Sequence, residues 1–158
     1  MRIHGVEAIA IDIPLPRNFG GSTYAVLKRS TVVTRLRADD GLVSEVYNGD
    51  NREHGAEIVR LIKEDLGPRL HGVDVLAIEQ TWDDLFTLSH ASRDRKTLME
   101  AIACVDCALW DVIGKACGLT VAELLGGKLR PLPIISIGGY YMPGKTLSDI
   151  GSEMEAYQ

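Results

Sequence analysis

Cysteine is scarce in this sequence, and the marks of a secreted or membrane protein are missing. The 158 residues include three cysteines, an odd number that argues against a disulfide framework and indicates a reducing compartment. Met1 is not followed by a signal peptide, and Asp106 interrupts the longest apolar stretch. We therefore predict a cytoplasmic protein with no membrane partner.

Short motifs of nucleotide and metal chemistry are also missing. The sequence has no G-x-G-x-x-G and no Walker loop, and its four histidines lack H-x-x-x-H or H-E-x-x-H spacing. Cys104 and Cys107 form a single C-x-x-C without a second pair or a nearby histidine, so we interpret the three cysteines as core residues. The net charge of −5 argues against nucleic acid as a partner.

The composition that remains is that of an ordinary globular protein, with 46% apolar and 25% charged residues. A chain of 158 residues can bury a real core. A complete eightfold β/α barrel needs roughly 250 residues, so this chain does not contain one.

Alternating hydrophobicity in the first third of the sequence predicts an antiparallel meander. Asp40-Gly41 is a strong hairpin signal because Asp-Gly tolerates positive φ at both central positions of the turn. Pro14 and Pro16 are expected to end the first strand. The predicted strands cover residues 2–13, 24–38 and 42–47, with a polar, glycine-rich loop at 17–23 and a second polar loop at 48–51.

The hydrophobic period then changes from two to 3.6, which predicts helices. We expect Asp74 to be the N-cap of the second helix, Thr97 and Glu100 to form the capping box of the third, and Gly118 to end it. The apolar stripes are Ile58, Val59, Ile62 and Leu66, ended by Gly67-Pro68; Val75, Ile78, Trp82 and Leu85; and Leu98, Ile102, Val105, Leu109, Val112 and Ala116.

The last 26 residues predict a strand at 133–141 and an amphipathic helix with Leu147, Ile150, Met154 and Tyr157 on one face. A strand followed by a crossover helix begins a parallel β/α unit, which needs a neighbouring strand. No further strand follows in the sequence, so we interpret the chain as a truncated piece of a longer protein.

Charged residues interrupt the apolar character of the long third helix. Asp111 and Lys115 are four apart in the favourable order for an ion pair. Asp106 lies in an apolar run, where a carboxylate needs a partner if it is buried. It is either an acid at an active site or a structural anchor between this helix and a barrel, and we favour the anchor.

The most specific motif lies between Ala101 and Gly127, where Ala-Leu-Trp-Asp-x-x-Gly-Lys is followed by Leu-Leu-Gly-Gly. It resembles the linker between the capping domain and the barrel in the mandelate racemase/muconate lactonizing enzymes of the enolase superfamily. Thr120 stands where that family usually has proline, and threonine can cap the same short helix. The resemblance extends over essentially the whole chain.

The resemblance implies an α+β fold, a three-stranded antiparallel meander followed by a helical bundle that leads into the first β/α unit of a TIM-type barrel. Residues 1–127 would be the capping domain with its linker, and residues 128–158 the start of the barrel. The implied enzyme removes the proton α to a carboxylate and forms an enediolate stabilised by Mg²⁺. By the same resemblance the metal ligands and catalytic residues lie on later barrel strands, so we assign none here.

The implied substrate is a small-molecule carboxylate, and the full-length protein is expected to be a homo-oligomer. We favour an acid-sugar dehydratase or a racemase. A muconate-type cycloisomerase is the alternative, and a non-catalytic barrel relative that acts as a binding or scaffold protein is a second one. A Lys-x-Lys strand end and three later acidic strand ends in the complete protein would favour the enzyme.

In the resembling family, the two polar loops close over the barrel mouth and contact the far end of the substrate. The first loop has a Gly20-Gly21 pair that we expect to act as a hinge. Two tyrosines at the carboxyl end of the first barrel strand lie on the face where such barrels bind substrate. The candidate substrate-binding residues are therefore Arg17, Asn18, Phe19, Tyr24, Tyr47, Asn48, Asp50, Tyr140 and Tyr141; the alternative for the loops is a solvent connection.

Overall fold

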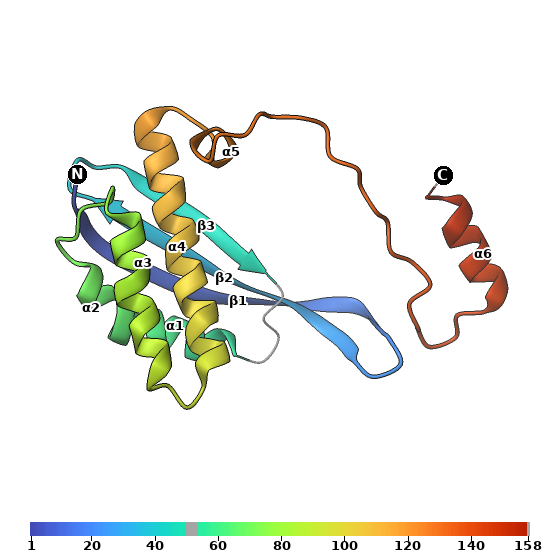
Figure 1. The fold of residues 1–158 in the computed structure, drawn as a ribbon. Coiled ribbons are helices and arrows are strands. Elements are labelled where there is room, and N and C mark those ends of the chain that lie inside the picture. The colour runs from blue at the N-terminus through green and yellow to red at the C-terminus, as the bar shows by residue number, and fades with distance from the viewer. Residues whose placement is uncertain (50–53, 158) are drawn as a thin grey trace. The chain divides into compact units, whose positions relative to one another are not determined.

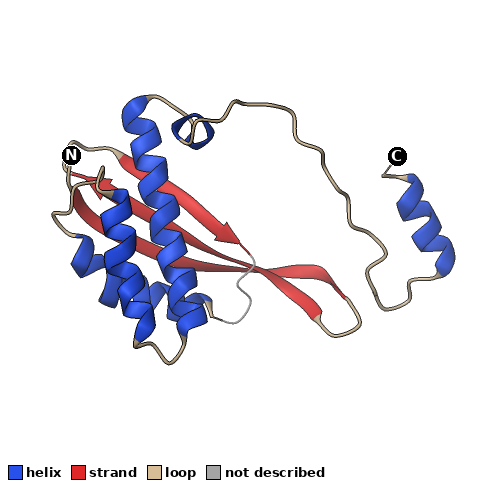
Figure 2. Ribbon diagram, in the orientation of Figure 1, coloured by secondary structure: helices blue, strands red, loops and turns tan. Residues whose placement is uncertain are grey.

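The chain begins with a three-stranded sheet in the order β1-β2-β3 (Figures 1 and 2). The computed structural model describes residues 1–49 and 54–157. The strands are β1 (Ile3–Gly20), β2 (Ala25–Ala38) and β3 (Val43–Gly49). β2 and β3 are antiparallel, in a register that pairs Arg37 with Val43 and Thr31 with Gly49. The predicted meander is confirmed.

Two compact units make up the chain. One contains Met1–Ile11 and Ser30–Leu129, and the other contains Asp12–Arg29 and Arg130–Gln158. The second unit therefore combines the far end of the β1-β2 hairpin with the C-terminal segment.

β1 runs through Pro14 and Pro16 to Gly20, so the prediction that these prolines end the strand was wrong. β1 is an edge strand of the sheet. An edge strand has hydrogen-bond partners on one side only, which is why sheets tolerate proline there. The predicted 17–23 loop thereby shrinks to a tight turn between Gly20 and Ala25.

Helices follow the sheet, and α3 and α4 lie side by side on one of its faces (Figure 1). No helix among the described residues is both long and apolar enough to cross a membrane. The helical elements are α1 (Gly55–Arg60), the π-helical η1 (Leu61–Leu66), α2 (Gly67–Leu70), α3 (Ile78–Thr87), the 3₁₀ turn η2 (Leu88–His90), α4 (Arg95–Cys117), α5 (Val121–Leu124) and α6 (Leu147–Glu155).

The core of the larger unit forms where α4 packs against the sheet and the preceding helices. The predicted stripe of α4 is buried as far as Val112, whereas Ala116 is exposed. Burying an aliphatic side chain of this size contributes roughly 1.5–3 kcal/mol. The buried residues include Leu36 of β2, Ile58, Ile62, Leu66, Leu70 and Leu85 of the other helical segments, Val75 of the turn before α3, and Ile102, Val105, Leu109 and Val112 of α4.

The first helical segment continues past the predicted stop at Gly67-Pro68 and ends at Leu70. A π-helical turn makes this possible, because the Gly67 N–H donates to the Ile62 carbonyl five residues earlier. Pro68 then stands in the first turn of α2, where its missing N–H removes no helical bond. The sequence pattern identified the buried face correctly but misplaced the end of the helix.

Two of the predicted helix caps were wrong. Asp74 accepts a bond from the Leu76 N–H at 3.2 Å, and α3 begins four residues later with Ala77 as its N-cap. α4 is capped by Asp94, whose carboxylate accepts the Thr97 N–H at 3.1 Å. Asp74 thus forms a local turn ahead of α3, whereas Asp94 itself caps α4 three residues before the predicted cap at Thr97.

The caps around α5 agree with the sequence prediction. Gly118 ends α4 in the left-handed conformation, at φ 66° and ψ 27°. Thr120 caps α5 and forms a complete capping box with Glu123. The threonine thus caps this helix as the sequence suggested.

Residues 133–141 do not form the predicted buried strand. Ile134 and Ile135 are 91% and 85% exposed, and within the described residues only Tyr141 pairs with another strand. A strand exists only when its backbone groups find partners, so β-propensity alone does not form one. The predicted helix that follows is confirmed as α6, capped by Thr146.

Candidate substrate-binding site

The tip of the β1-β2 hairpin is a tight turn built on two glycines. The Gly21 N–H donates to the Tyr24 carbonyl at 3.0 Å. A Cβ on Gly20 would lie 2.2 Å from that carbonyl oxygen, and one on Gly21 would lie 2.6 Å from the Tyr24 ring. Neither glycine has a positive φ. The glycines therefore permit a close approach of Tyr24, and their role as a hinge stays a prediction.

The hairpin tip pairs with the C-terminal segment of the same unit. The backbones of Gly20 and Tyr141 exchange two hydrogen bonds, of 3.0 and 2.9 Å. The rings of Phe19 and Tyr140 lie 4.8 Å apart at 54°, within the range of favourable aromatic pairs. Arg29 places its guanidinium carbon 5.5 Å from the centre of the Phe19 ring. The structure thus joins three predicted site residues, Phe19, Tyr140 and Tyr141.

The segment that receives the tip is held by a cluster around Glu153 of α6. This carboxylate pairs with Lys145 and accepts bonds from the Tyr157 hydroxyl at 3.1 Å and the Gly139 N–H at 3.4 Å. The Lys145 ammonium, which donates to Glu153, holds the pKa of that carboxyl below its usual range. Lys145 also donates to the Tyr140 carbonyl at 3.2 Å, so the cluster fixes the backbone on both sides of Gly139 and Tyr140.

The other predicted residues of this unit present exposed side chains. Arg17 and Asn18 are exposed near the end of β1. Tyr24 is 46% exposed and Tyr141 is 66% exposed, although the Tyr141 backbone is paired. These side chains are exposed in the same unit that holds the Phe19–Tyr140 contact.

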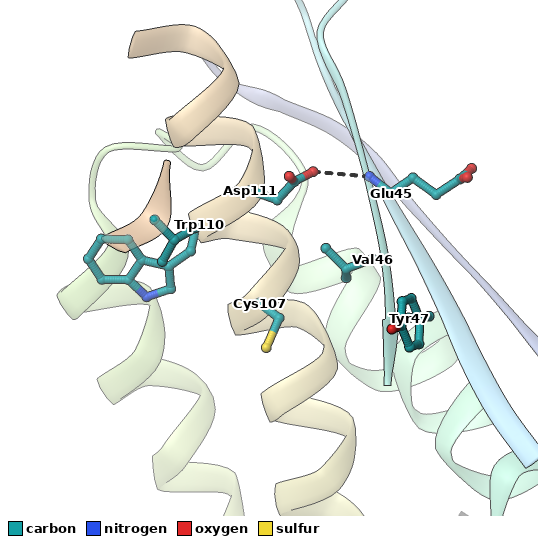
Figure 3. Close-up of a pocket in the computed structure, with 7 residues that line it drawn as sticks. Glu45, Val46, Tyr47, Cys107, Trp110 and Asp111 are labelled. Atoms are coloured by element: carbon teal, nitrogen blue, oxygen red, sulfur yellow. Dashed lines mark hydrogen bonds between the residues drawn. The ribbon is translucent and has the colours of Figure 1, made fainter. Parts of the chain in front are cut away.

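Tyr47 and Asn48 lie in the larger unit, on β3. Tyr47 lines a pocket of about 440 Å³ between β3 and α4 (Figure 3). Asn48 donates to the Cys107 thiol at 3.8 Å, and its amide oxygen is buried without a hydrogen-bond partner among the described residues. Asp50, the remaining predicted residue, lies outside the described residues. The pocket is lined by Glu45, Val46, Tyr47, Cys107, Trp110, Asp111 and Val121.

Asp111 and Lys115 form the predicted ion pair, at 2.7 Å, and both also bind the backbone of β3. Asp111 accepts the Glu45 N–H at 3.2 Å (Figure 3), and Lys115 donates to the Val43 carbonyl at 3.1 Å. An edge strand leaves such groups unpaired within its sheet. The pair therefore attaches α4 to β3, and Asp111 also lines the pocket.

Asp106 lies half-buried in a neighbouring pocket of about 320 Å³ together with Ile78, Glu79, Trp82 and Trp110. Burial, with a smaller contribution from the nearby Glu79 carboxylate, raises the pKa of Asp106. No hydrogen bond or ion pair reaches this carboxylate from the part of the chain that the structure describes. A role as an anchor or as an active-site acid stays a prediction.

The three cysteines differ in environment, so the interpretation of all three as core residues was wrong. Cys104 is buried, whereas Cys107 and Cys117 are exposed. Burial raises the pKa of the Cys104 thiol to about 11. Over residues 1–49 and 54–157, no group of three or more His, Cys, Asp or Glu side chains is placed to hold a metal ion.

Sequence reasoning missed several residues that shape this site. Lys145 precedes α6 and Glu153 lies on it, so no spacing within one helix or strand relates the two residues. Glu153 and Tyr157 are four apart on the predicted helix, and that spacing could have indicated their contact. Arg29 lies in an alternating strand, where nothing in the pattern distinguishes it from other exposed positions.

Comparisons of the sequence identify similar proteins. Residues 6–126 match the sequence model of the family described as mandelate racemase / muconate lactonizing enzyme, N-terminal domain. A D-galactonate dehydratase family member from Pseudarthrobacter chlorophenolicus is 39% identical over 104 residues, covering 65% of this chain and 24% of that protein. The chloromuconate cycloisomerase of Cupriavidus pinatubonensis is 30% identical over 161 residues, covering 98% of this chain and 41% of that protein.

Solved structures show the same likeness. A mandelate racemase/muconate lactonizing enzyme has a TM-score of 0.90 and 42% identity, and the alignment covers 99% of this chain and 42% of that one. A second such enzyme, from a marine actinobacterium and in complex with magnesium, has a TM-score of 0.78 and 37% identity, covering 99% and 41%. The chain therefore spans 24% to 42% of the length of these proteins.

Proposed function

This chain belongs to the mandelate racemase/muconate lactonizing enzyme family, and we propose that it is the N-terminal part of an enzyme that abstracts the proton α to a carboxylate. We propose that residues 1–127 form the capping domain with its linker and that residues 128–158 begin a barrel. The match of residues 6–126 to the family's N-terminal domain carries this proposal. The proposed substrate is a small-molecule carboxylate, and the proposed assembly is a homo-oligomer.

The chemistry requires help from outside the described residues. The carbon next to a carboxylate is a very weak acid, and a divalent metal supplies the positive charge that stabilises the enediolate. Magnesium in the related marine actinobacterial structure supports this choice of metal. The described residues of this chain do not fit such a site, because they include no suitable cluster of ligands. We therefore assign neither the metal nor the catalytic base to them.

We propose that the hairpin tip selects the substrate and excludes water from the reacting end. Phe19 and Tyr140 form an aromatic contact, and Tyr24 and Tyr141 extend exposed hydroxyl-bearing rings from the same unit. Such a surface suits the part of a substrate that lies away from its carboxylate. Exclusion of water strengthens the electrostatic interactions of the reacting groups.

An acid sugar is the proposed substrate and dehydration the proposed reaction, supported by the likeness to the Pseudarthrobacter protein named as a D-galactonate dehydratase family member. Racemisation of a hydroxy acid proceeds through the same enediolate. A muconate-type cycloisomerisation is the second candidate, supported by the likeness to the Cupriavidus chloromuconate cycloisomerase. None of the relatives named above supports a non-catalytic scaffold.

The experiment is proton exchange in the complete natural protein. Incubation in D₂O with magnesium and a panel of sugar acids and muconates should exchange the α-proton, form a dehydrated product or close a lactone. The same incubation with a chelator is the control and should show no exchange. Absence of exchange and of product across the panel, in a folded and metal-loaded protein, would contradict the proposal.

Substitution of the tip tests the proposed role of this unit. Phe19→Ala and Tyr24→Ala should change the ratio of kcat/KM between two substrates that differ only far from the carboxylate. Metal content should stay the same, because the described residues do not bind the metal. If the ratio of kcat/KM is unchanged in both variants, the tip is a solvent-exposed turn that does not select the substrate.

A further inference from the structure

The hairpin tip is held by contacts with the C-terminal segment of the same unit. Two backbone hydrogen bonds join Gly20 to Tyr141, and the Phe19 ring packs on the Tyr140 ring. The position of Phe19 and Tyr24 therefore depends on where Tyr140 and Tyr141 lie. Whatever holds these two tyrosines also holds the tip.

Lys145 and Glu153 bind the backbone of this segment directly. Lys145 binds the Tyr140 carbonyl and pairs with Glu153, while Glu153 accepts the Gly139 N–H. Gly139 itself has a φ of 76°, a conformation that other residues rarely adopt.

The Lys145–Glu153 pair differs from an ordinary surface ion pair. The side chains of Lys145 and Glu153 are only 12% and 25% exposed. The Lys96–Glu100 pair on α4, by contrast, is separated by 4.0 Å and its lysine is 76% exposed. Exposed pairs of that kind contribute little, whereas a shielded pair that also binds backbone groups fixes a conformation.

We propose that Lys145 and Glu153 are positioning residues that set the substrate selectivity of the hairpin tip without touching the substrate. The chain of contacts runs from Lys145 to the Tyr140 carbonyl, from Tyr140 to Phe19, and from Tyr141 to Gly20. This inference rests on the proposed function, because selectivity has meaning only for a catalytic protein. The order of the tip, however, can be measured without any substrate.

The experiment compares Lys145→Met with Lys145→Arg and with Lys96→Met as the matched control, all in the complete natural protein. Amide hydrogen exchange at Gly20 reports the tip, because its N–H donates to Tyr141. The ratio of kcat/KM for two substrates that differ far from the carboxylate reports selectivity. Lys145→Met should raise Gly20 exchange and change the ratio by about tenfold, since small misplacements have large kinetic effects.

Rescue separates positioning from a general loss of stability. Lys145→Arg keeps a charged donor for both acceptors and should restore most of the exchange protection and of the ratio. Lys96→Met should change neither. Glu153→Gln is a second variant that keeps the shape of the side chain and removes the charge, and it should reproduce the effect of Lys145→Met.

Each outcome decides the inference. If Lys145→Met and Glu153→Gln leave Gly20 exchange as in the wild type, the pair does not hold the tip and the inference is overturned. Faster exchange with an unchanged substrate ratio also overturns it, and leaves the proposed function intact. If the wild-type protein has no activity, the proposed function has failed, and Gly20 exchange alone then decides whether the pair holds the tip.

Discussion

Alanine at Gly20 should disrupt the hairpin tip, while alanine at Gly21 should not. At Gly20 the new Cβ would lie 2.2 Å from the Tyr24 carbonyl oxygen, which belongs to the backbone and cannot rotate away. At Gly21 it would lie 2.6 Å from the ring of Tyr24, which is a side chain with rotatable bonds and not part of the backbone. Two adjacent glycines with similar sequence surroundings are thus expected to respond differently.

The magnitudes follow from what must move. To remove the clash at Gly20, the backbone must move by about 1 Å, which breaks the hydrogen bond from the Gly21 N–H to the Tyr24 carbonyl. Overpacking costs about 1–3 kcal/mol, and the lost hydrogen bond costs about 1 kcal/mol. Water replaces part of that hydrogen bond, so we expect the free energy needed to open the turn to fall by about 2 kcal/mol. The population of the open turn should then rise roughly thirtyfold. At Gly21 only a rotamer change is needed, which costs about 1 kcal/mol.

Amide hydrogen exchange over the turn checks this difference in the complete protein. The exchange rate of the Gly21 amide in the Gly20→Ala variant should rise by roughly thirtyfold. Gly5→Ala is the control, because nothing lies within 4 Å of a Cβ at that position of β1. Equal protection in the Gly20→Ala and Gly5→Ala variants would refute the steric reasoning.

Three further changes test the larger unit. Asp111→Ala removes the acceptor of the Glu45 N–H and should lower the free energy of unfolding, measured by urea titration, by about 1–2 kcal/mol. An unchanged free energy would mean that water fully replaces the lost hydrogen bond. Ile102→Ala should lower the free energy of unfolding by about 2–5 kcal/mol in the same titration, because this side chain is 1% exposed. A decrease of less than about 1 kcal/mol would show that the core is loosely packed. Alkylation at pH 8 followed by mass spectrometry should label the exposed Cys117 and spare the buried Cys104. The pKa of the Cys104 thiol, about 11, leaves roughly one thiolate in a thousand at that pH. Equal labelling of the two cysteines would contradict the burial of Cys104.

Much of the fold follows from local patterns in the sequence. Alternation predicted the meander, and the 3.6 period identified the buried face of α4 from Leu98 to Val112 because burial there repeats once per turn. Gly118 and Thr120 were predicted as caps since each acts within one turn of its own helix. These features depend on neighbours in the sequence, which a single sequence displays.

The failures arise where distant contacts or competing local bonds decide. Pro14 is tolerated because β1 lies at an edge of the sheet, which the strand's own sequence does not reveal. Residues 133–140 have a strong β pattern but lack a partner strand among the described residues. In the site, Phe19, Tyr140 and Tyr141 came from the family resemblance. The Lys145–Glu153 pair joins a residue before α6 to one on it, so its prediction required the structure.

The pairing of Gly20 with Tyr141 has a consequence for how the protein is made. It joins positions roughly 120 residues apart, and contacts of such long sequence separation form slowly because a large loop must close first. On a ribosome that adds about 5–20 residues per second, the hairpin emerges on the order of ten seconds before its partner. During that time the outer part of the hairpin lacks the backbone hydrogen bonds that Gly20 later makes with Tyr141. Under the proposed function, the site that selects the substrate is complete only once residues 130–157 have been synthesised.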